Sequence, residues 1–188
     1  MFEINIEPDL KLREIQMSDS AFIFSIIDRD REYLREWLPF VDDTRMVEDT
    51  ENFIKSVLAG PADRIETVYV IIYENQPAGL IGYRNTDRAN HKTELGYWIA
   101  KDLQGKGIVT KACKALINFA FEIFNMNRIQ ICVSIDNHKS KAIPLRLGFK
   151  FEGIQRAGEY LNDHFTNLEI YSMLRSEWAH QSENNETL

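Results

Sequence analysis

Two glycines flank a lysine at the start of an apolar helix in the segment "KDLQGKGIVTKACKAL" (101–116). A strand-like run, 93–100, precedes it, and no Ser, Thr, Asp or Asn stands directly before Ile108 to cap the helix. The first N–H groups of such a helix lack partners and carry partial positive charge. Gly105 and Gly107 permit a tight turn and the close approach of a bulky anion. The segment therefore predicts either a phosphate-binding loop or a turn that only needs positive φ.

The loop matches neither of two common phosphate motifs. No Gly-Lys-Ser/Thr follows at the Walker spacing, and Thr110 stands where the dinucleotide motif has its third glycine. The local charge favours an anion, because residues 101–150 hold nine bases and three acids in a chain of net charge −7. That negative total argues against general nucleic-acid binding, and the acidic residues 1–50 suit a cationic partner.

Length and composition predict one globular domain. The 188 residues fit a single domain over 1–178, followed by a disordered polar tail, 179–188. No apolar run reaches the length of a membrane span and the start of the chain is acidic, so we expect a cytoplasmic protein without a membrane partner. Cys113 and Cys132 are expected to be buried structural thiols, and without a C-x-x-C pair no metal is expected.

Hydrophobic periodicity predicts the element order β–α–α–α–β–β–β–α–β–α–β–β. The predicted strands are 10–16, 65–74, 78–85, 93–100, 128–135 and a last hairpin of 149–156 and 164–174 around a turn at 157–163. The first predicted helix begins near Ser18. The others cover 31–39, 46–60, the segment from Ile108, and 137–148, which is interrupted at Pro144. The short links of the three-strand meander make it antiparallel, and the unit 93–135 is a right-handed parallel crossover. The expected fold is mixed α/β: one twisted sheet of about seven strands flanked by four or five helices, with a cleft where the parallel strands part.

Four segments together resemble one enzyme family, the GNAT N-acetyltransferase superfamily. The segment "GYWIAKDLQGKGIVTKACKALINFAFE" resembles its acetyl-coenzyme A motif, with Gln104 and Gly107 matching and Val109 where Gly or Ala is usual. "YLREWLPFVDDTRMVEDTENFI", "DNHKSKAIPLRLGFKFEG" and "EYLND" resemble segments of the RimJ/RimL branch, which acetylates N-termini of ribosomal proteins, and of its YdaF-like members. The resemblance covers 10–174.

The resemblance implies a GNAT fold whose sheet is splayed at an acetyl-CoA cleft. The backbone amides of the loop would carry the pyrophosphate, a splay after Trp98 and Ile99 would receive the pantetheine arm, and the Asn137 side chain would hydrogen-bond along it. Lys106 would add positive charge near the phosphates. The residues implied for acetyl-CoA are Trp98, Ile99, Gln104, Gly105, Lys106, Gly107, Ile108, Val109, Thr110 and Asn137.

Two catalytic roles follow from the same resemblance. Glu159 matches a proposed general base, acting directly or through water, and Ser140 matches a proposed general acid for the leaving thiolate. Read from the residues alone, Glu159 is equally well a solvated turn carboxylate, and Ser140 a first-turn residue bonded to the backbone. Glu94, on the strand before the loop, is an alternative base. Trp37 either lines the substrate side of the cleft or packs between two helices.

The predicted activity is transfer of an acetyl group from acetyl-CoA to a protein N-terminal amine, such as that of a ribosomal protein. The transfer would proceed by direct attack in a ternary complex. The alternatives are an N-acetyltransferase for small amines, such as polyamines, amino acids or an antibiotic, and a non-catalytic CoA-binding protein. A homodimer is expected from the resemblance only.

Overall fold

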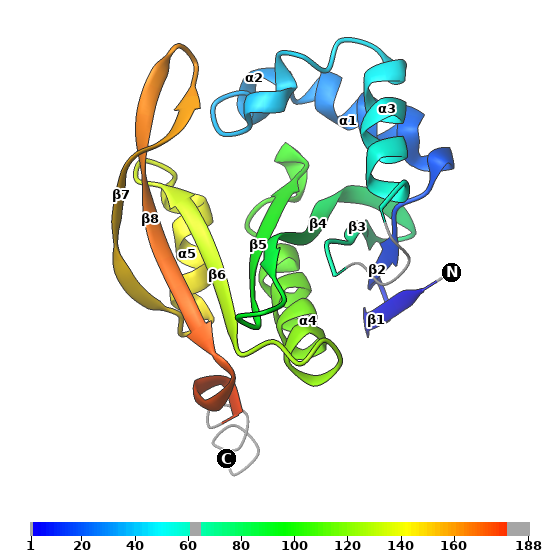
Figure 1. Ribbon diagram of the computed structural model, residues 1–188. Helices are drawn as coiled ribbons and strands as arrows, with labels where there is room; N and C mark the ends of the chain where they lie inside the picture. Colours follow the sequence, from blue (N-terminus) through cyan, green and yellow to red (C-terminus); the bar gives the residue numbers. More distant parts are fainter. Residues whose placement is uncertain (1, 61–64, 180–188) are drawn as a thin grey trace.

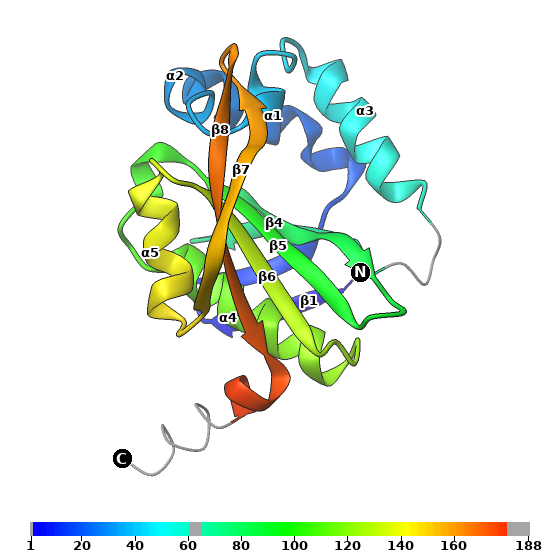
Figure 2. The same ribbon diagram turned by 60° about the vertical axis from the view of Figure 1, so that its left-hand side comes forward.

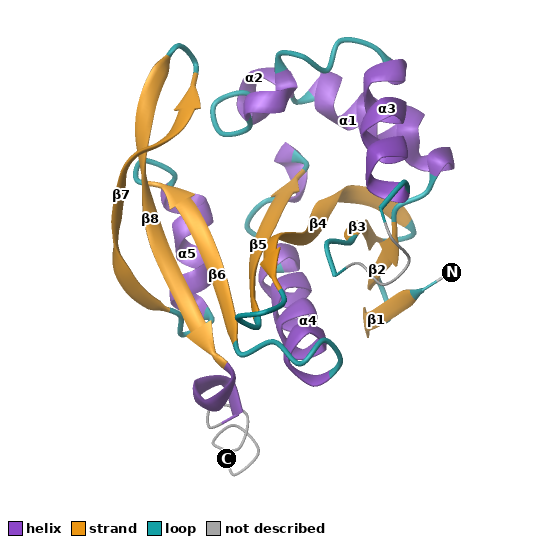
Figure 3. Ribbon diagram, viewed as in Figure 1, coloured by secondary structure: helices purple, strands orange, loops and turns teal. Residues whose placement is uncertain are grey.

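The computed structural model describes residues 2–60 and 65–179, so the predicted tail lies outside it from residue 180 onward. These residues build an eight-stranded mixed sheet in the order β1-β2-β3-β4-β5-β6-β8-β7, with helices on both faces (Figures 1 and 3). The strands are β1 (Glu3–Glu7), β2 (Leu10–Glu14), β3 (Val68–Tyr73), β4 (Gln76–Asp87), β5 (Lys92–Ile99), β6 (Arg128–Ser134), β7 (Lys150–Leu161) and β8 (His164–Leu174). The helices are α1 (Ser20–Arg29), α2 (Arg31–Leu34), α3 (Val47–Leu58), α4 (Ile108–Glu122) and α5 (His138–Arg146), with short 3-10 turns η1 (Met17–Asp19), η2 (Pro39–Val41) and η3 (Lys101–Leu103) and a helical segment at 175–179.

The sequence prediction missed β1. It pairs antiparallel with β2 and lengthens the sheet by one edge strand. Its only apolar side chains are Ile4 and Ile6, which are partly buried against the main core. Two half-buried residues give a weak periodic signal, so this edge strand depends on its neighbour β2 and not on its own pattern.

Strand alternation separates two cores on opposite faces of the sheet. Ile81 of β4 and Ile99 of β5 point to the face covered by α4, whose residues at spacings of three and four are buried there. Their neighbours Leu80 and Trp98 point to the other face and pack with α1 and α3. The middle of the sheet, at β4 and β5, is therefore covered on both sides.

The parallel crossover forms as predicted, but its two strands pair only briefly. β5 and β6 pair in parallel at three successive positions, which end at Glu94 opposite Gln130. From Leu95 to Ile99, β5 is paired only with β4, and Figure 1 shows β5 and β6 diverging. The splay thus begins at Leu95, directly after Glu94, whereas the prediction placed it after Trp98 and Ile99.

The last hairpin is longer than predicted, and this moves Glu159 from a turn into a strand. β7 continues to Leu161, and only Asn162 and Asp163, both with positive φ, form the connection. Between Gln155 and Glu159 the register with β8 shifts, so β7 carries a bulge. The hairpin reaches toward α2, where the Asn162 side chain donates a hydrogen bond of 3.1 Å to the Arg35 carbonyl (Figure 2).

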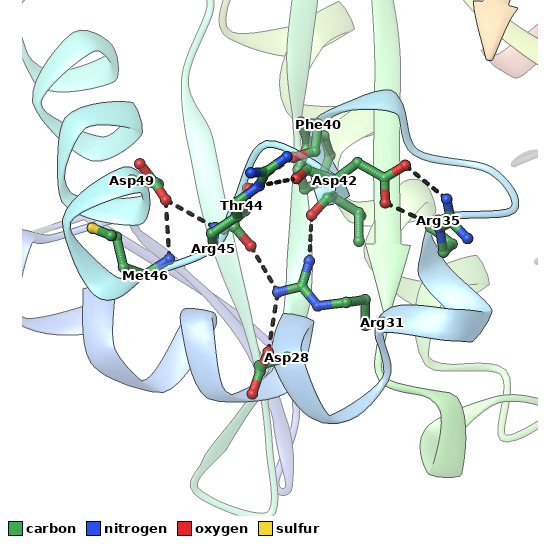
Figure 4. A network of polar contacts seen from close by, with 10 residues as sticks. Asp28, Arg31, Arg35, Phe40, Asp42, Thr44, Arg45, Met46 and Asp49 are labelled. Atoms are coloured by element: carbon green, nitrogen blue, oxygen red, sulfur yellow. Dashed lines mark hydrogen bonds and ion pairs between the residues drawn. The ribbon is translucent and has the colours of Figure 1, made fainter. Parts of the chain in front are cut away.

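The second predicted helix, 31–39, ends early at Leu34, and the chain then turns through η2. Figure 4 shows what holds this turn: Arg31 donates to the carbonyls of Val41 and Thr44 at 2.5 and 2.7 Å. Arg35 and Asp42 form a two-bond ion pair across the same turn. These contacts replace helical hydrogen bonds and fix the segment that faces the splayed strands.

Backbone packing at β4 gives a stability prediction with a matched control. A Cβ atom at Gly79 would lie 2.2 Å from the Trp98 carbonyl oxygen, whereas one at Gly96 would meet only the Arg84 side chain, at 3.6 Å. Gly79→Ala should therefore destabilise the fold by about 1–3 kcal/mol, because backbone atoms must move. Gly96→Ala should be near neutral, and denaturant unfolding of both variants checks the difference; equal losses would contradict it.

Candidate active site

A cavity of about 1110 Å³ follows the splay between β5 and β6. Its lining includes the loop 104–107 and the start of α4 as well as Arg84 and Glu159. The α2 segment contributes Trp37, Leu38 and Pro39 to its wall, so Trp37 borders the cavity. One cavity therefore connects the glycine loop, the splayed strands and Glu159.

The glycine loop leaves an open space in front of α4. Gly105 and Gly107 have φ values of 75° and 76°, and Gly107 is the N-cap of α4 without any side-chain cap. A Cβ atom built at either glycine would meet nothing within 4 Å. Free N–H groups, a helix N-terminus and empty space fit a phosphate group, so the loop suits the anion that the sequence predicted.

Cations gather at this end of the cavity. Lys106 lies 5.6 Å from the centre of the Tyr73 ring. Lys139 of α5 donates to the Gln104 side chain and Arg146 donates to the Thr110 hydroxyl, each at 2.8 Å. The cavity lining includes one carboxylate, Glu159, which lies toward the other end, so the loop end is positive throughout.

The predicted apolar residues form the walls. Trp98 and Ile99 both line the cavity while their side chains enter opposite cores. Ile108 and Val109 begin α4 and are buried in the core beneath the loop. The bulk of Val109, where the family motif has Gly or Ala, is thus accommodated by core packing.

Ser140 is positioned by a proline and a tyrosine. Asn137 caps α5 by accepting a hydrogen bond of 3.0 Å from the Ser140 N–H. Pro144 has no N–H for the Ser140 carbonyl four residues earlier, and the Tyr97 hydroxyl donates to that carbonyl at 3.3 Å. The Ser140 hydroxyl in turn donates to the Tyr97 oxygen at 3.3 Å. Ser140 therefore borders the cavity with its side chain held against β5 across the splay.

Glu159 faces the cavity from β7 and is half-buried. Burial raises the pKa of its carboxyl, the positive charge of Arg84 lowers it, and the negative charge of Glu94 raises it further. A strand carboxylate with a raised pKa differs from the solvated turn residue that the sequence left open. It can exchange a proton nearer to neutral pH than an exposed glutamate.

Glu94, the alternative base, is already engaged. It is buried and lies opposite Arg84 in the β4–β5 register. The Arg84 Nε donates to Glu94 Oε1 at 2.7 Å, the Arg84 Nη2 lies 2.5 Å from the same oxygen, and Asn85 donates to Oε2 at 3.1 Å. Both oxygens of this carboxylate therefore already accept hydrogen bonds.

The cysteines are reduced, and only Cys113 is fully buried as predicted. Cys132 lies on the cavity face of β6 and is partly exposed, because the splay uncovers that face. Burial and the nearby Glu94 charge raise the pKa of Cys132 to about 11. Its thiol is therefore protonated at neutral pH. Within residues 2–60 and 65–179, no three His, Cys, Asp or Glu side chains lie close enough to hold a metal ion, and no helix is long and apolar enough to cross a membrane.

The model of the acetyltransferase (GNAT) domain family matches residues 9–150. The chain belongs to the GNAT family. Acetyl-CoA is the acetyl donor of this family, and it is therefore the donor that this acetyltransferase uses. The computed fold and the family therefore assign one chemistry, acetyl transfer to an amine.

Several known proteins are similar over nearly the whole chain. YdaF of Bacillus subtilis, provisionally named a ribosomal N-acetyltransferase, is 35% identical and covers 95% of this chain and 98% of its own length. The ribosomal-protein-serine acetyltransferase of Escherichia coli is 25% identical, and the match covers 91% of this chain and 96% of the E. coli protein. The spermidine N(1)-acetyltransferase of E. coli is 24% identical, and the match covers 84% of this chain and 82% of that protein. The solved structure of RimL with coenzyme A, an acetyltransferase of the ribosomal L7/L12 α-amine, has a TM-score of 0.89 at 22% identity and covers 94% of this chain and 99% of that one.

Sequence reasoning missed several residues that line this enzyme's cavity. These residues are Arg84, Lys139 and Arg146, which carry charge into it. Each is an ordinary strand or helix residue in the sequence. Only the pairing of distant elements across the splay brings them together.

The loop geometry predicts how glycine substitutions affect donor binding. Gly107→Ala places a methyl group in the space before α4 and should weaken acetyl-CoA binding about 10-fold or more, because close approach to the N–H groups is lost. Gly148→Ala is the matched control: its φ is 74° but it lies outside the cavity lining. Both variants should lose similar stability, on the order of 1 kcal/mol.

Calorimetric titration of acetyl-CoA into both variants, with thermal unfolding alongside, separates the two effects. Equal affinities in the two variants would contradict the assignment of the loop.

Proposed function

We propose that this enzyme acetylates the α-amine of a protein N-terminus, such as that of a ribosomal protein. The observation that carries the proposal is one cavity whose lining includes both a half-buried carboxylate, Glu159, and a basic glycine loop. Its volume of about 1110 Å³ leaves room for an acceptor beside the donor. The ribosomal names of YdaF and of the E. coli serine acetyltransferase support the same acceptor class.

The reaction proceeds in one ternary complex. The loop at 104–110 and the wall from Trp98 to Ile99 hold the thioester in the splay, and effective molarities on the order of 10⁵ M make this positioning a large part of the rate. Glu159 accepts the proton of the attacking amine, directly or through a water. The Ser140 hydroxyl protonates the leaving thiolate and regains a proton from solvent, to which Glu159 releases the proton of the amine. Cys132, protonated at neutral pH, takes no part as a nucleophile.

Intact-protein mass spectrometry tests the acceptor. A ribosomal-protein fraction from a strain lacking this enzyme is incubated with purified enzyme and acetyl-CoA. A gain of one acetyl group on one protein, mapped to its N-terminal residue, is the expected result. If no protein gains mass while spermidine is acetylated and acetyl-CoA binding is intact, the acceptor is a small amine, as the spermidine acetyltransferase relative would suggest.

The role of Glu159 predicts a pH effect with a definite sign. Its raised pKa means that the active, deprotonated form is lost as pH falls through a value above the ordinary carboxyl range. The attacking α-amine must also be deprotonated, and this adds a separate limb to the pH–rate profile at about pH 8. Glu159→Gln should lower kcat about 100-fold or more and remove the lower limb, leaving the amine limb in place.

Steady-state rates against pH, with Glu122→Gln as an exposed carboxylate control, measure this effect. Ser140→Ala should lower kcat without moving either limb. An unchanged lower limb in Glu159→Gln would assign the base elsewhere.

A further inference from the structure

Arg84 occupies the point where the sheet opens. Its guanidinium lies over Gly96, which comes two residues after the last β5–β6 pair and has no side chain to displace it. The Nε and Nη2 groups are held by Glu94, so the plane of the guanidinium is fixed. Arg84 borders both the main cavity and a second cavity of about 440 Å³ that continues past it.

The guanidinium still has donors to offer. Among the described residues, its hydrogen bonds go to Glu94 alone, and its side chain is 55% exposed. An arginine presents five N–H donors, so those on Nη1 are directed toward the cavity space or solvent. A donor set that is fixed by an ion pair and partly exposed is suited to hold a carbonyl oxygen.

The charges around this point match one kind of acceptor. Glu159 and Glu94 provide two carboxylates, and Arg84 provides one cation. The charges of Arg84 and Glu94 both shift the pKa of Glu159, so the three groups lie near one another. A peptide N-terminus carries an ammonium group and a carbonyl oxygen on the same carbon. A polyamine carries cations only, and a guanidinium beside its amine would repel it.

We propose that Arg84 binds the carbonyl oxygen of the acceptor's first residue and so selects α-amines over alkylamines. Glu159 faces the amine while Arg84 holds the carbonyl, and Glu94 keeps the guanidinium in place. The second cavity, lined by Asn85, Gln130 and Gln155, receives the chain beyond that carbonyl. This inference rests on the proposed N-terminal acceptor.

The test replaces one carbonyl oxygen of the substrate by a weaker hydrogen-bond acceptor. The probes are a Ser-Ala-Ala amide peptide, the same peptide with its first carbonyl oxygen replaced by sulfur, and spermidine. Sulfur is a weak hydrogen-bond acceptor, so the wild-type enzyme should prefer the oxygen peptide in kcat/KM by about 10-fold or more, as expected for a bond from a charged donor.

Arg84→Met is made together with Glu94→Gln, so that no buried carboxylate is left unpaired, and is compared with Glu94→Gln alone. The double variant should lose the oxygen preference. Glu94→Gln alone should keep most of it, because the amide oxygen of glutamine can still accept the hydrogen bonds that hold Arg84. Arg156→Met, which removes an exposed arginine outside both cavities, should also keep it. Arg84→Lys, which keeps Glu94 paired, is the second variant and should lose most of the preference. Acetyl-CoA affinity, measured for each variant, verifies that it is folded.

The outcomes separate the two proposals. An oxygen preference that persists without Arg84 overturns the role of Arg84 and leaves the N-terminal acceptor standing. Failure of the wild-type enzyme to acetylate either peptide, whether or not spermidine reacts, overturns both.

Discussion

The early end of the β5–β6 ladder is the constraint on which the active site depends. Parallel strands normally continue their hydrogen bonds along their common length, and unpaired backbone groups are costly unless they meet water or a ligand. Here pairing stops at Glu94, which leaves one edge of β5 open from Leu95 to Ile99. The open edge persists because β4 holds β5 on its other side and the two cores hold both faces.

The two ends of the resulting channel have opposite electrostatic character, and each follows from its local structure. At one end, the start of α4, the glycines and the cations Lys106, Lys139 and Arg146 together attract phosphate. At the other end, partial burial makes Glu159 a stronger base than an exposed glutamate. The cations near the loop and the Glu159 carboxylate therefore line one cavity at the splay.

The sequence predicted the parts of this site that are encoded locally. The glycine loop and the amphipathic α4 are local patterns, and the structure has both. The start of the splay was predicted four residues too late, because nothing in the run from Thr93 to Ile99 marks where a ladder ends. Glu159 was placed in a turn, because the bulge in β7 interrupts the alternation that would have revealed a longer strand. Arg84 was missed since its importance comes only from lying opposite Glu94 and above Gly96.

Side-chain bonds replace part of the missing ladder. Tyr97 of β5 reaches the carbonyl that Pro144 leaves free in α5, and Lys139 reaches Gln104 from the same helix. These contacts span the gap that backbone hydrogen bonds would otherwise close. The splay is therefore bridged by side chains, while backbone hydrogen bonds hold β5 to β4 and β6 to β8 on either side of it.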